Sequence, residues 1–381
     1  MKDITNIRSE IDAIDQELAR LFRRRLEIVA DVAASKHERG APVTDPARER
    51  DILSRVTAEV GPEYENGARL FFATLFGIAK ARQRTMLNGE APLVKAIRAS
   101  RDAFERFPTR AVVACPGTEG SSAQQATSIM FQLPTILYFT SFDKVFEAVE
   151  QGLCPYGILP IENSAAGSVA AVYDLMVKHR FHIARALRLK VDHVLLAAHG
   201  VKLSDVREII SHPHALAQCG DFLKAHPEIK AVPGANTAVG AKALSASGRR
   251  DAAVIASRAC AELYGLDVIA EDIADAVYNY TRFICISKDL QIYPDANKFS
   301  IMLSLPHRPG SPNGLISKFA AINVNLTKLE SRPIPGMDFE FRFTFDFEAP
   351  PSDPSVLALL AELAQDPEIE HFTFLGAYAE R

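Results

Sequence analysis

The sequence has few cysteines, and they lack the patterns in which cysteines usually cross-link a chain or bind zinc. The five are Cys115, Cys154, Cys219, Cys260 and Cys285, and no two of them form a CxxC pair. An odd number without such spacing argues against a disulfide framework and against a structural zinc site. We therefore expect a cytoplasmic protein, in a reducing compartment, with no metal and no cofactor.

Other absences exclude two kinds of partner. The formal charge is −4, from 43 basic and 47 acidic residues, so the basic surplus typical of nucleic-acid binding is missing. No uninterrupted apolar stretch is long enough to span a bilayer, and the first residues contain no apolar signal region. We expect neither nucleic acid nor a membrane as a partner. A length of 381 residues suggests two or three domains.

The first segment contains neither glycine nor proline between residues 3 and 38. Its apolar residues recur in steps of three and four, which predicts a helix that packs on another helix. These residues are Ile4, Ile7, Ile11, Ile14, Leu18, Leu21, Ile28 and Val32. Such a helix is roughly 50 Å long at its rise per residue. Residues 1–90 are too few to cover it, so we expect a partner chain, in a homodimer or homotetramer.

A positive charge interrupts this apolar series at Arg25, where a leucine would be expected. Burial of an unpaired charge is costly, so the guanidinium needs an anionic partner. Taken alone, Arg25 favours an ion pair with an acidic residue, or a side chain that reaches water, over a ligand contact. Lys36 lies near the same face, and Arg8 lies beside the series near its start.

Two further helices follow. Asp45 is a good N-cap and Pro46 suits the first helical position of a helix that Gly61 ends. Arg48 and Glu49 fall in its first turn. A third helix runs from about residue 63 to residue 87, with Gln83 near its end.

Residues 1–90 resemble the all-helical chorismate mutases. The matching residues are Arg8, Asp15, Arg25, Lys36, Pro42-Val43-x-Asp45-x-x-Arg48-Glu49-Arg50 and Gln83. The resemblance implies a helical dimer with two active sites, in which the first-helix arginine crosses to the partner's site. It implies that the carboxylates of chorismate are bound by Arg8, Arg25 and Arg48, with Asp45 in the same substrate-binding set. Lys36 and Gln83 would contact the ether oxygen, and Glu49 the hydroxyl.

The chemistry of that reaction suits these residue types. Conversion of chorismate to prephenate is a rearrangement of a dianion, which needs no nucleophile, metal or acid–base pair. It needs the reactive conformer to be held and charge to be stabilised on the breaking C–O bond. Ala79 stands where the family commonly has a serine. The alternative is therefore a helical domain that serves only to dimerise the protein.

The pattern changes between Arg110 and about Lys288, after a helical connector over residues 91–108. Short apolar runs now alternate with helical stretches, which predicts α/β architecture. The runs are Ala111–Cys115, Ile136–Phe139, Tyr156–Ile161, Val206–Ile210, Ala252–Ala256 and Phe283–Ile286. Polar segments follow several of these runs, and ligands bind at such strand ends. We expect a pocket for a small anion there, with His212 and His214 either structural or near the substrate.

Residues 109–289 resemble prephenate dehydratases. The matching segments are Pro160-Ile161-Glu162-Asn163-Ser164-x-x-Gly167-x-Val169, Ser211-His212-Pro213 with Ala217-Gln218-Cys219, Asn236-Thr237-Ala238 and Asn279-Tyr280-Thr281-Arg282-Phe283. The resemblance implies two α/β subdomains, as in periplasmic binding proteins, with the site in the cleft and Thr281 as the essential residue. The implied substrate-binding residues are Asn163, Ser164, Ser211, Asn236, Thr237, Arg282 and Phe283.

The implied reaction expels hydroxide and CO2 from prephenate to give phenylpyruvate. Thr281 would donate a hydrogen bond to the leaving hydroxyl. Glu162 is either the proton source or a residue that caps a helix or pairs with an arginine. Ser122 and Ala123 replace an aromatic residue and a serine of the family's glycine loop, so arogenate is an alternative substrate. A third hypothesis is a solute-binding or sensor protein without enzyme activity, because the fold alone does not distinguish a binding protein from an enzyme.

The last segment follows a linker at residues 289–297. Its predicted elements are strand Lys298–Leu305, helix Asn313–Ile322, strand Val324–Glu330, strand Asp338–Phe347, helix Val356–Ala364 and strand His371–Ala377. This βαββαβ order predicts a ferredoxin-like α+β fold. Phenylalanines at alternate positions from Phe339 to Phe347 predict a half-buried antiparallel strand.

Residues 297–381 resemble an ACT domain, an amino-acid-sensing module. The resemblance lies in Glu330-Ser331-Arg332-Pro333 and in Gly310-Ser311-Pro312. It implies L-phenylalanine as an effector bound by Gly310, Ser311, Glu330, Ser331 and Arg332. A purely structural role in dimerisation is the alternative. The whole chain is thus expected to be a multidomain, feedback-regulated enzyme of phenylalanine biosynthesis that uses chorismate and prephenate. The alternative is a monofunctional dehydratase.

Overall fold

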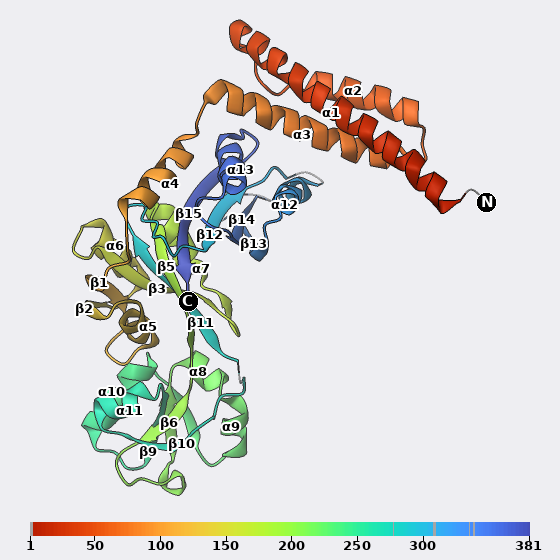
Figure 1. The fold of residues 1–381 in the computed structure, drawn as a ribbon. Helices are drawn as coiled ribbons and strands as arrows, with labels where there is room; N and C mark the ends of the chain where they lie inside the picture. The colour runs from red at the N-terminus through yellow and green to blue at the C-terminus, as the bar shows by residue number, and fades with distance from the viewer. Residues whose placement is uncertain (1–2, 277, 308–309, 335, 338–339) are drawn as a thin grey trace. The chain divides into compact units, whose positions relative to one another are not determined.

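The computed structural model describes residues 3–276, 278–307, 310–334, 336–337 and 340–381. They form two compact units. The first comprises residues 1–98, 303–343 and 352–372, and the second comprises residues 99–302, 344–351 and 373–381 (Figure 1). The chain therefore passes from one unit to the other more than once, and the N-terminal helices share their unit with parts of the C-terminal segment.

Three long helices open the first unit: α1 Ile4–Arg39, α2 Pro46–Val60 and α3 Glu65–Asn88. Asp3 caps α1, and α1 ends where Gly40 adopts the left-handed conformation, with φ of 62°. Asp45 caps α2 by accepting a hydrogen bond of 3.0 Å from the Arg48 backbone N–H. The three predicted helices are thus present, within a few residues of their predicted ends.

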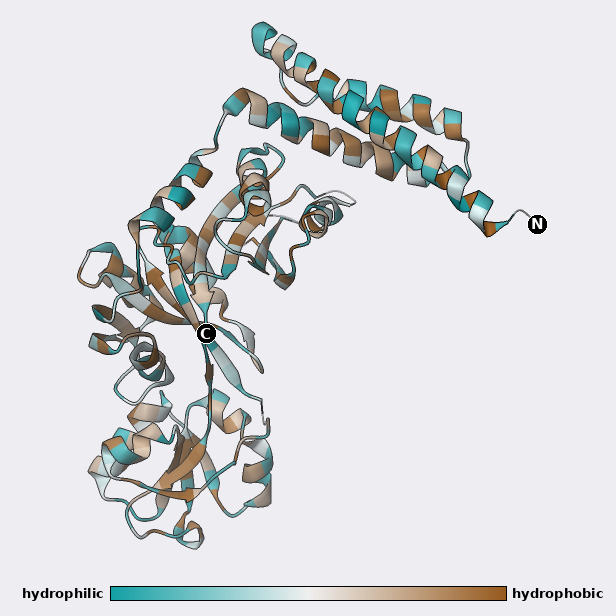
Figure 2. Ribbon diagram, viewed as in Figure 1, coloured by the Kyte–Doolittle hydropathy of each residue, from teal (hydrophilic) through white to brown (hydrophobic). Residues whose placement is uncertain are grey.

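The contact between α1 and α3 buries only part of the apolar series on α1. Val29 and Ala33 of α1 are buried, as are Leu75, Phe76 and Ala79 of α3. The residues nearer the start of α1 remain exposed, among them Ile4, Ile11, Ile14, Leu18 and Leu21. Figure 2 colours α1 in alternating hydrophilic and hydrophobic bands. The helix thus carries an apolar stripe that its own chain leaves uncovered.

Helix α4, Pro92–Ala103, leads into the larger sheet of the second unit. Its strands up to residue 287 are β1 Arg110–Pro116, β2 Leu133–Phe139, β3 Tyr156–Asn163, β4 Gly167–Ser168, β5 His182–Lys190 and β11 Tyr280–Ser287. The covering helices are α5 Ser122–Met130, α6 Phe142–Glu150 and α7 Ala170–His179. Two separate buried clusters, one with α6 and α7 and the other with α5, show that both faces of this sheet are covered.

A second sheet has the strand order β10-β6-β9-β7-β8. Its strands are β6 Val194–Ala197, β7 Glu208–Ser211, β8 Lys230–Pro233, β9 Ala252–Ala256 and β10 Asp267–Ala270. Its helices are α8 Pro213–Ala217, α9 Gly220–Ala225, α10 Thr237–Ser247, α11 Ala259–Tyr264 and a 3-10 turn at Leu203–Asp205. Every residue of β9 is buried, as expected for a central strand with helices on both sides.

The C-terminal segment has the element order βαββαβ: β12 Lys298–Ser304, α12 Ser311–Ala321, β13 Leu326–Pro333, β14 Phe341–Glu348, α13 Pro354–Gln365 and β15 Glu370–Glu380. The larger sheet has the order β13-β14-β12-β15-β5-β11-β3-β1-β2, with β4 paired to β3. The close approach of β15 to β5 needs Gly376, where a Cβ would lie 2.5 Å from the Ile183 carbonyl oxygen.

Two expectations from the sequence need correction. The strand at Phe341–Glu348 is not half-buried, because Thr344 and Asp346, between the phenylalanines, are buried as well. Phe339 lies outside the described residues. The segment 289–297 is not a simple linker, since Ile292 and Tyr293 are fully buried in it.

Several strands were absent from the expectation, namely β4, β5, β6, β8 and β10. In β5, Arg185 and Arg188 interrupt the apolar pattern, and β8 is only four residues long and mostly exposed. The five cysteines are free and buried. Within the described part of the chain, no helix has the length and apolar character needed to cross a membrane.

Candidate active sites

The helical site begins with Arg25, the charge within the apolar series of α1. Its Nη1 donates a hydrogen bond of 3.3 Å to the Leu75 carbonyl oxygen, and its guanidinium lies 5.9 Å from the centre of the Phe76 ring. Partial burial lowers its pKa from the usual value. No acidic side chain pairs with Arg25 in the described contacts, and the partly buried guanidinium keeps access to solvent.

The other residues expected in this site lie on all three helices. Lys36 donates a hydrogen bond of 2.6 Å to the Val43 carbonyl oxygen. Gln83 is buried, and its Nε2 donates only a long bond of 3.4 Å to the Ala79 carbonyl oxygen. Its Oε1 is buried and has no partner among the described residues. Such a side chain can turn its amide toward a ligand at little cost.

Glu49 pairs with a residue that sequence reasoning missed. Lys80 Nζ lies 3.2 Å from Glu49 Oε1, and both side chains are largely buried. Lys80 follows Ala79, so a cation adjoins the position where the family commonly has a serine. Arg8 and Arg48 are exposed, and Asp45 is occupied in capping α2. The three helices therefore carry basic side chains of the kind that bind a dicarboxylate.

The second site centres on Thr281, the first residue of the Thr-Arg-Phe motif. Thr281 lies opposite Asn163 in the pairing of β11 with β3. Asn163 Nδ2 donates to Thr281 Oγ1 at 3.0 Å and to Asn279 Oδ1 at 2.9 Å. Asn163 Oδ1 accepts from the backbone N–H groups of Ala165 and Ala166, which fixes the orientation of the amide. Thr281 is therefore held at the end of its strand by a rigid amide.

This contact continues toward a pocket. Asn279 Nδ2 donates to Gln218 Oε1 at 3.2 Å, and His193 Nε2 lies 2.8 Å from the same oxygen. A chain of hydrogen bonds thus runs from Thr281 through Asn163, Asn279 and Gln218 to His193. We call it the amide chain. Sequence reasoning placed Asn279 and Gln218 in matching motifs but assigned them no role, and it did not single out His193.

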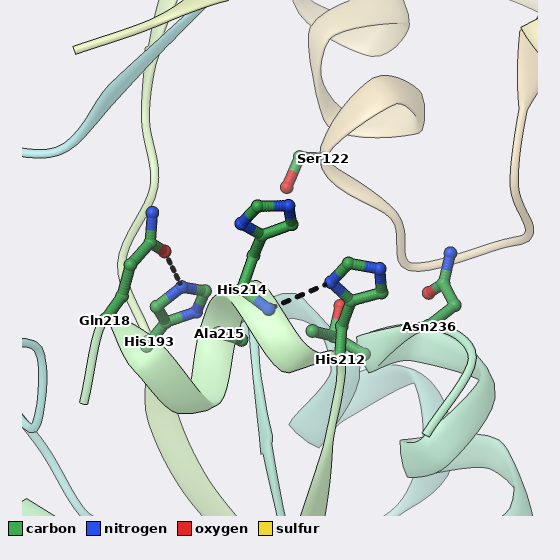
Figure 3. Close-up of a pocket in the computed structure, with 8 residues that line it drawn as sticks. Ser122, His193, His212, His214, Ala215, Gln218 and Asn236 are labelled. Carbon is green, nitrogen blue, oxygen red and sulfur yellow. Dashed lines mark hydrogen bonds between the residues drawn. The ribbon is translucent and has the colours of Figure 1, made fainter. Parts of the chain in front are cut away.

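The pocket has a volume of about 180 Å³ and combines side chains from both parts of the α/β unit (Figure 3). Its lining residues are Ser122, His193, His212, His214, Ala215, Gln218, Asn236 and Thr237. The rings of His212 and His214 stack with centroids 5.4 Å apart. Asn236 also caps α10, where its Oδ1 accepts from the Ala238 N–H at 2.8 Å. Apart from Ala215, the pocket is lined by polar side chains that can form hydrogen bonds to a ligand.

Two of the pocket histidines, His193 and His212, have environments that favour the neutral imidazole. Burial lowers the pKa of His193, and burial together with the neighbouring His214 lowers the pKa of His212. Because Gln218 Oε1 is an acceptor, His193 Nε2 carries the proton. His193 Nδ1 is then an acceptor, and it is buried without a partner among the described residues.

The structure gives three of the expected substrate-binding residues roles away from the pocket. Ser211 is fully buried and donates 2.7 Å to the Ile255 carbonyl oxygen, which ties β7 to β9. Phe283 lies in the core. Ser164 is exposed, and its hydroxyl contacts the backbone of residues 278 and 280.

Arg282 belongs to a buried ionic network. Its Nη1 lies 2.5 Å from Asp346 Oδ2, and its Nη2 lies 2.6 Å from the Tyr378 hydroxyl and 3.1 Å from Glu380 Oε2. Burial alone would lower the pKa of Arg282, but Tyr378, Asp346 and Glu380 raise it well above its usual value. Arg282 is therefore always charged and is held by the C-terminal strands.

Glu162 lies beside this network. Its carboxylate is 3.8 Å from Arg282 Nη1, and its side chain is 36% exposed. Of the two alternatives from the sequence, pairing with an arginine is the one that the contacts display. The Glu162 carboxyl group is thus not buried, although burial was the condition for its role as proton source.

The expected effector residues lie on two elements. Gly310, with φ of 83°, precedes α12, and Ser311 is its first residue. Glu330, Ser331 and Arg332 lie on β13, where Glu330 is 3.1 Å from Lys328 Nζ. Among the described residues, one cluster has the spacing that could hold a metal ion. It consists of Glu340, Glu370 and His371, whose potential ligand atoms lie within 4.8 Å of one another. Exposed acidic groups of this kind are common without a metal.

Two family models match this chain. Prephenate dehydratase matches residues 113–291, and chorismate mutase type II matches residues 7–84. The chloroplastic arogenate dehydratase/prephenate dehydratase 2 of Arabidopsis thaliana is 38% identical over 257 residues, which cover 64% of this chain and 67% of that protein. The chain belongs to the prephenate dehydratase family. It also carries a chorismate mutase domain upstream, so the dehydratase and mutase domains lie in one chain.

Solved structures support the fold. The prephenate dehydratase of Arthrobacter aurescens, in complex with L-Phe, is 32% identical, with a TM-score of 0.63, and the match covers 70% of this chain and 89% of that one. A second structure, described as GqqA, a novel type of quorum quenching acylase, is 27% identical, with a TM-score of 0.63, over 71% of this chain and 98% of that one. Because one fold hosts both descriptions, the function rests on the site residues.

Proposed function

We propose that this enzyme converts chorismate to prephenate in its helical domain and prephenate to phenylpyruvate in its α/β domain, under feedback inhibition by L-phenylalanine. The observation that carries the proposal is the amide chain from Thr281 to the pocket, together with the unpaired Arg25 in the helical domain. We place the mutase at residues 1–90, the connector at 91–108, the dehydratase at 109–289 and the regulatory domain at 297–381, in a cytoplasmic enzyme.

In the mutase reaction, Arg8, Arg25 and Arg48 bind the two carboxylates of chorismate, with Asp45 holding the Arg48 turn. Lys36 and Gln83 donate hydrogen bonds to the ether oxygen, on which negative charge grows as the C–O bond breaks. Glu49 accepts from the substrate hydroxyl, and Lys80 holds that carboxylate in place. The site needs a second chain, because Arg8 lies far along α1 from Arg25 and the apolar stripe of α1 is exposed.

In the dehydratase reaction, Thr281 keeps its proton and donates a hydrogen bond to the hydroxyl group, which leaves as hydroxide while CO2 is lost. Asn163 Nδ2 already donates to Thr281 Oγ1, so the Thr281 hydrogen is free to point at the substrate. Ser122, Asn236 and Thr237 contact the carboxylates from the pocket wall. Glu162 is the second proton donor to be tested, although its present contact is with Arg282.

The C-terminal segment is proposed to be an ACT domain of ferredoxin-like fold. The βαββαβ order and the strand order β13-β14-β12-β15 support this. The L-Phe in the Arthrobacter aurescens structure supports phenylalanine as the effector here. Gly310, Ser311, Glu330, Ser331 and Arg332 are the residues proposed to bind it.

Separate assays on the purified chain test the two activities. Chorismate loss is followed for the wild type and for Arg25→Ala, which we expect to lose about 100-fold or more in rate because a donor to the transition state is gone. Phenylpyruvate formation is followed with and without L-phenylalanine, for the wild type and for Glu330→Ala. An unchanged mutase rate in Arg25→Ala would overturn the proposed mutase site. A dehydration rate that L-phenylalanine does not change would overturn the proposed feedback regulation.

Arogenate is the second candidate substrate. The observation that favours it is Ser122 in the pocket wall, where the family usually has an aromatic residue, together with the arogenate dehydratases among the relatives. Arogenate carries an amino group where prephenate carries a keto group. Competition between equal concentrations of the two substrates measures the preference directly, and we expect prephenate to be consumed faster.

A further inference from the structure

The helical domain is tied to the C-terminal segment by a buried ion pair. Arg84 Nη1, on α3, lies 3.0 Å from Asp366 Oδ2, at the end of α13, and these side chains are 7% and 12% exposed. A second bond joins the same two helices, from Asn88 Nδ2 to Gln365 Oε1 at 3.4 Å. Both pairs lie within the first compact unit.

The position of these contacts on α3 gives them a consequence for chemistry. Arg84 and Asn88 are four residues apart and therefore lie on one face of the last turns of α3. Gln83 precedes Arg84 and points about 100° away around the helix. Anchoring Arg84 to Asp366 therefore restrains the rotation of the last turns of α3, beyond the residues that pack on α1, and with it the direction of the Gln83 side chain.

Gln83 depends on this support because little else holds its amide. Its described hydrogen bond is the 3.4 Å contact within its own helix, and its Oε1 is buried without a partner. Fixing the helix is then the main way to hold the amide where charge develops on the substrate. Misplacement by about 1 Å is enough to cost about 100-fold in rate.

We propose that Asp366 and Arg84 are positioning residues of the chorismate mutase site, so that the mutase is completed by α13 of the C-terminal segment. The inference rests on the proposed mutase role of Gln83. It assigns to the C-terminal segment a role in catalysis by the N-terminal helices, in addition to effector binding.

Asp366→Asn in the full-length chain is the test. It keeps the size of the side chain but removes the charge that holds Arg84. The matched control is Glu362→Gln, which removes a charge four residues earlier on α13, where Glu362 pairs with Lys318 at 2.5 Å. For Asp366→Asn we expect mutase kcat to fall roughly tenfold to 100-fold with KM changed much less, because Gln83 acts on the transition state.

Two further measurements distinguish a loss of Gln83 positioning from a general loss of folding. Dehydratase activity of the same Asp366→Asn preparation should stay at the wild-type level, and Arg84→Lys, which keeps the charge, should retain more mutase kcat than Arg84→Ala. Mutase kcat within about twofold of wild type in Asp366→Asn, or an equal loss in Glu362→Gln, overturns the inference. A parallel loss of both activities in Asp366→Asn also overturns it. A wild type without any mutase activity instead overturns the proposed function.

Discussion

At the scale of single residues, the dehydratase site is organised by amide side chains more than by charges. Asn163 uses both ends of its amide, since its oxygen accepts from the backbone at Ala165 and Ala166 while its nitrogen donates to Thr281. Gln218 receives hydrogen bonds from Asn279 and His193 on one oxygen. Each polar group fixes the next, so the orientation of the Thr281 hydroxyl depends on the whole amide chain.

Thr281→Val keeps the shape of the side chain and removes the hydroxyl. We expect the dehydratase kcat to fall by about 100-fold to 1000-fold, the usual cost of removing one donor to a transition state. Thr281→Ser should keep most of the activity because it keeps the donor. The measurement is phenylpyruvate formation from prephenate, with mutase activity of the same preparation as the control. Equal rates for Thr281→Val and wild type would contradict the role of Thr281.

His193 predicts how stability depends on pH. Burial lowers the pKa of His193 below its usual value of 6.5. Just below pH 6.5, His193 is therefore protonated in the unfolded chain but still neutral in the folded chain. Its contribution to stability is therefore complete above that value and is lost as the pH falls below it. We expect the unfolding temperature to drop on acidification, and to drop less steeply in His193→Gln. Identical pH dependence of the unfolding temperature in the two proteins would exclude His193 as a cause of the acid destabilisation. Some pH dependence should remain in both proteins, because the pKa values of His182 and His212 are also lowered.

At the scale of elements, strand β11 serves three purposes with three successive residues. Thr281 ends at the amide chain, Arg282 enters the ionic network and Phe283 enters the core. A bulge against β3 makes this possible, because the register shifts between Arg282 and Phe283 and leaves one extra residue, Ile161, on β3. The ionic network then fixes the strand from the side of β12, β14 and β15.

Asp346→Asn tests the ionic network. It leaves the buried guanidinium of Arg282 without its closest carboxylate, so we expect the second unit to lose about 3 kcal/mol of stability. The loss should appear as a lower denaturant midpoint of dehydratase activity. The control is Asp251→Asn, which breaks an exposed pair with Arg249 at 2.9 Å and should leave the midpoint unchanged. Equal midpoints for all three proteins would show that the network contributes no stability.

The apolar stripe of α1 carries a prediction about assembly. Replacing both Ile14 and Leu18 with glutamate should convert a dimer to a monomer, because two charges would enter the interface, and mutase activity should disappear with it. The control places the same charges on the opposite face with Ser9→Glu and Gln16→Glu, both exposed positions. Sedimentation measures the oligomeric state. A monomeric wild type, or a dimer that survives the stripe substitutions, would contradict the account.

At the scale of the whole molecule, the elements with a clear apolar period or a recognisable motif could be predicted from the sequence. Features that depend on contacts between residues far apart in the chain could not. The three N-terminal helices and the βαββαβ order follow from apolar spacing and turn residues. Strand β5 was missed because Arg185 and Arg188 look like surface residues, although Arg185 is buried against the Phe107 ring at 4.1 Å. Arg282 was expected at the substrate, because nothing near it in sequence reveals Asp346 and Glu380. Likewise, Lys80 and Asp366 gain their significance only from residues brought together by folding.

The central claim is that one chain performs both reactions, and a single time course tests it. The purified wild type is incubated with chorismate near neutral pH, and all three compounds are followed by NMR in one tube. We expect chorismate to decay, prephenate to appear transiently and phenylpyruvate to accumulate. Chorismate that persists as it does without enzyme, while added prephenate is consumed, would show that the helical domain only dimerises the dehydratase.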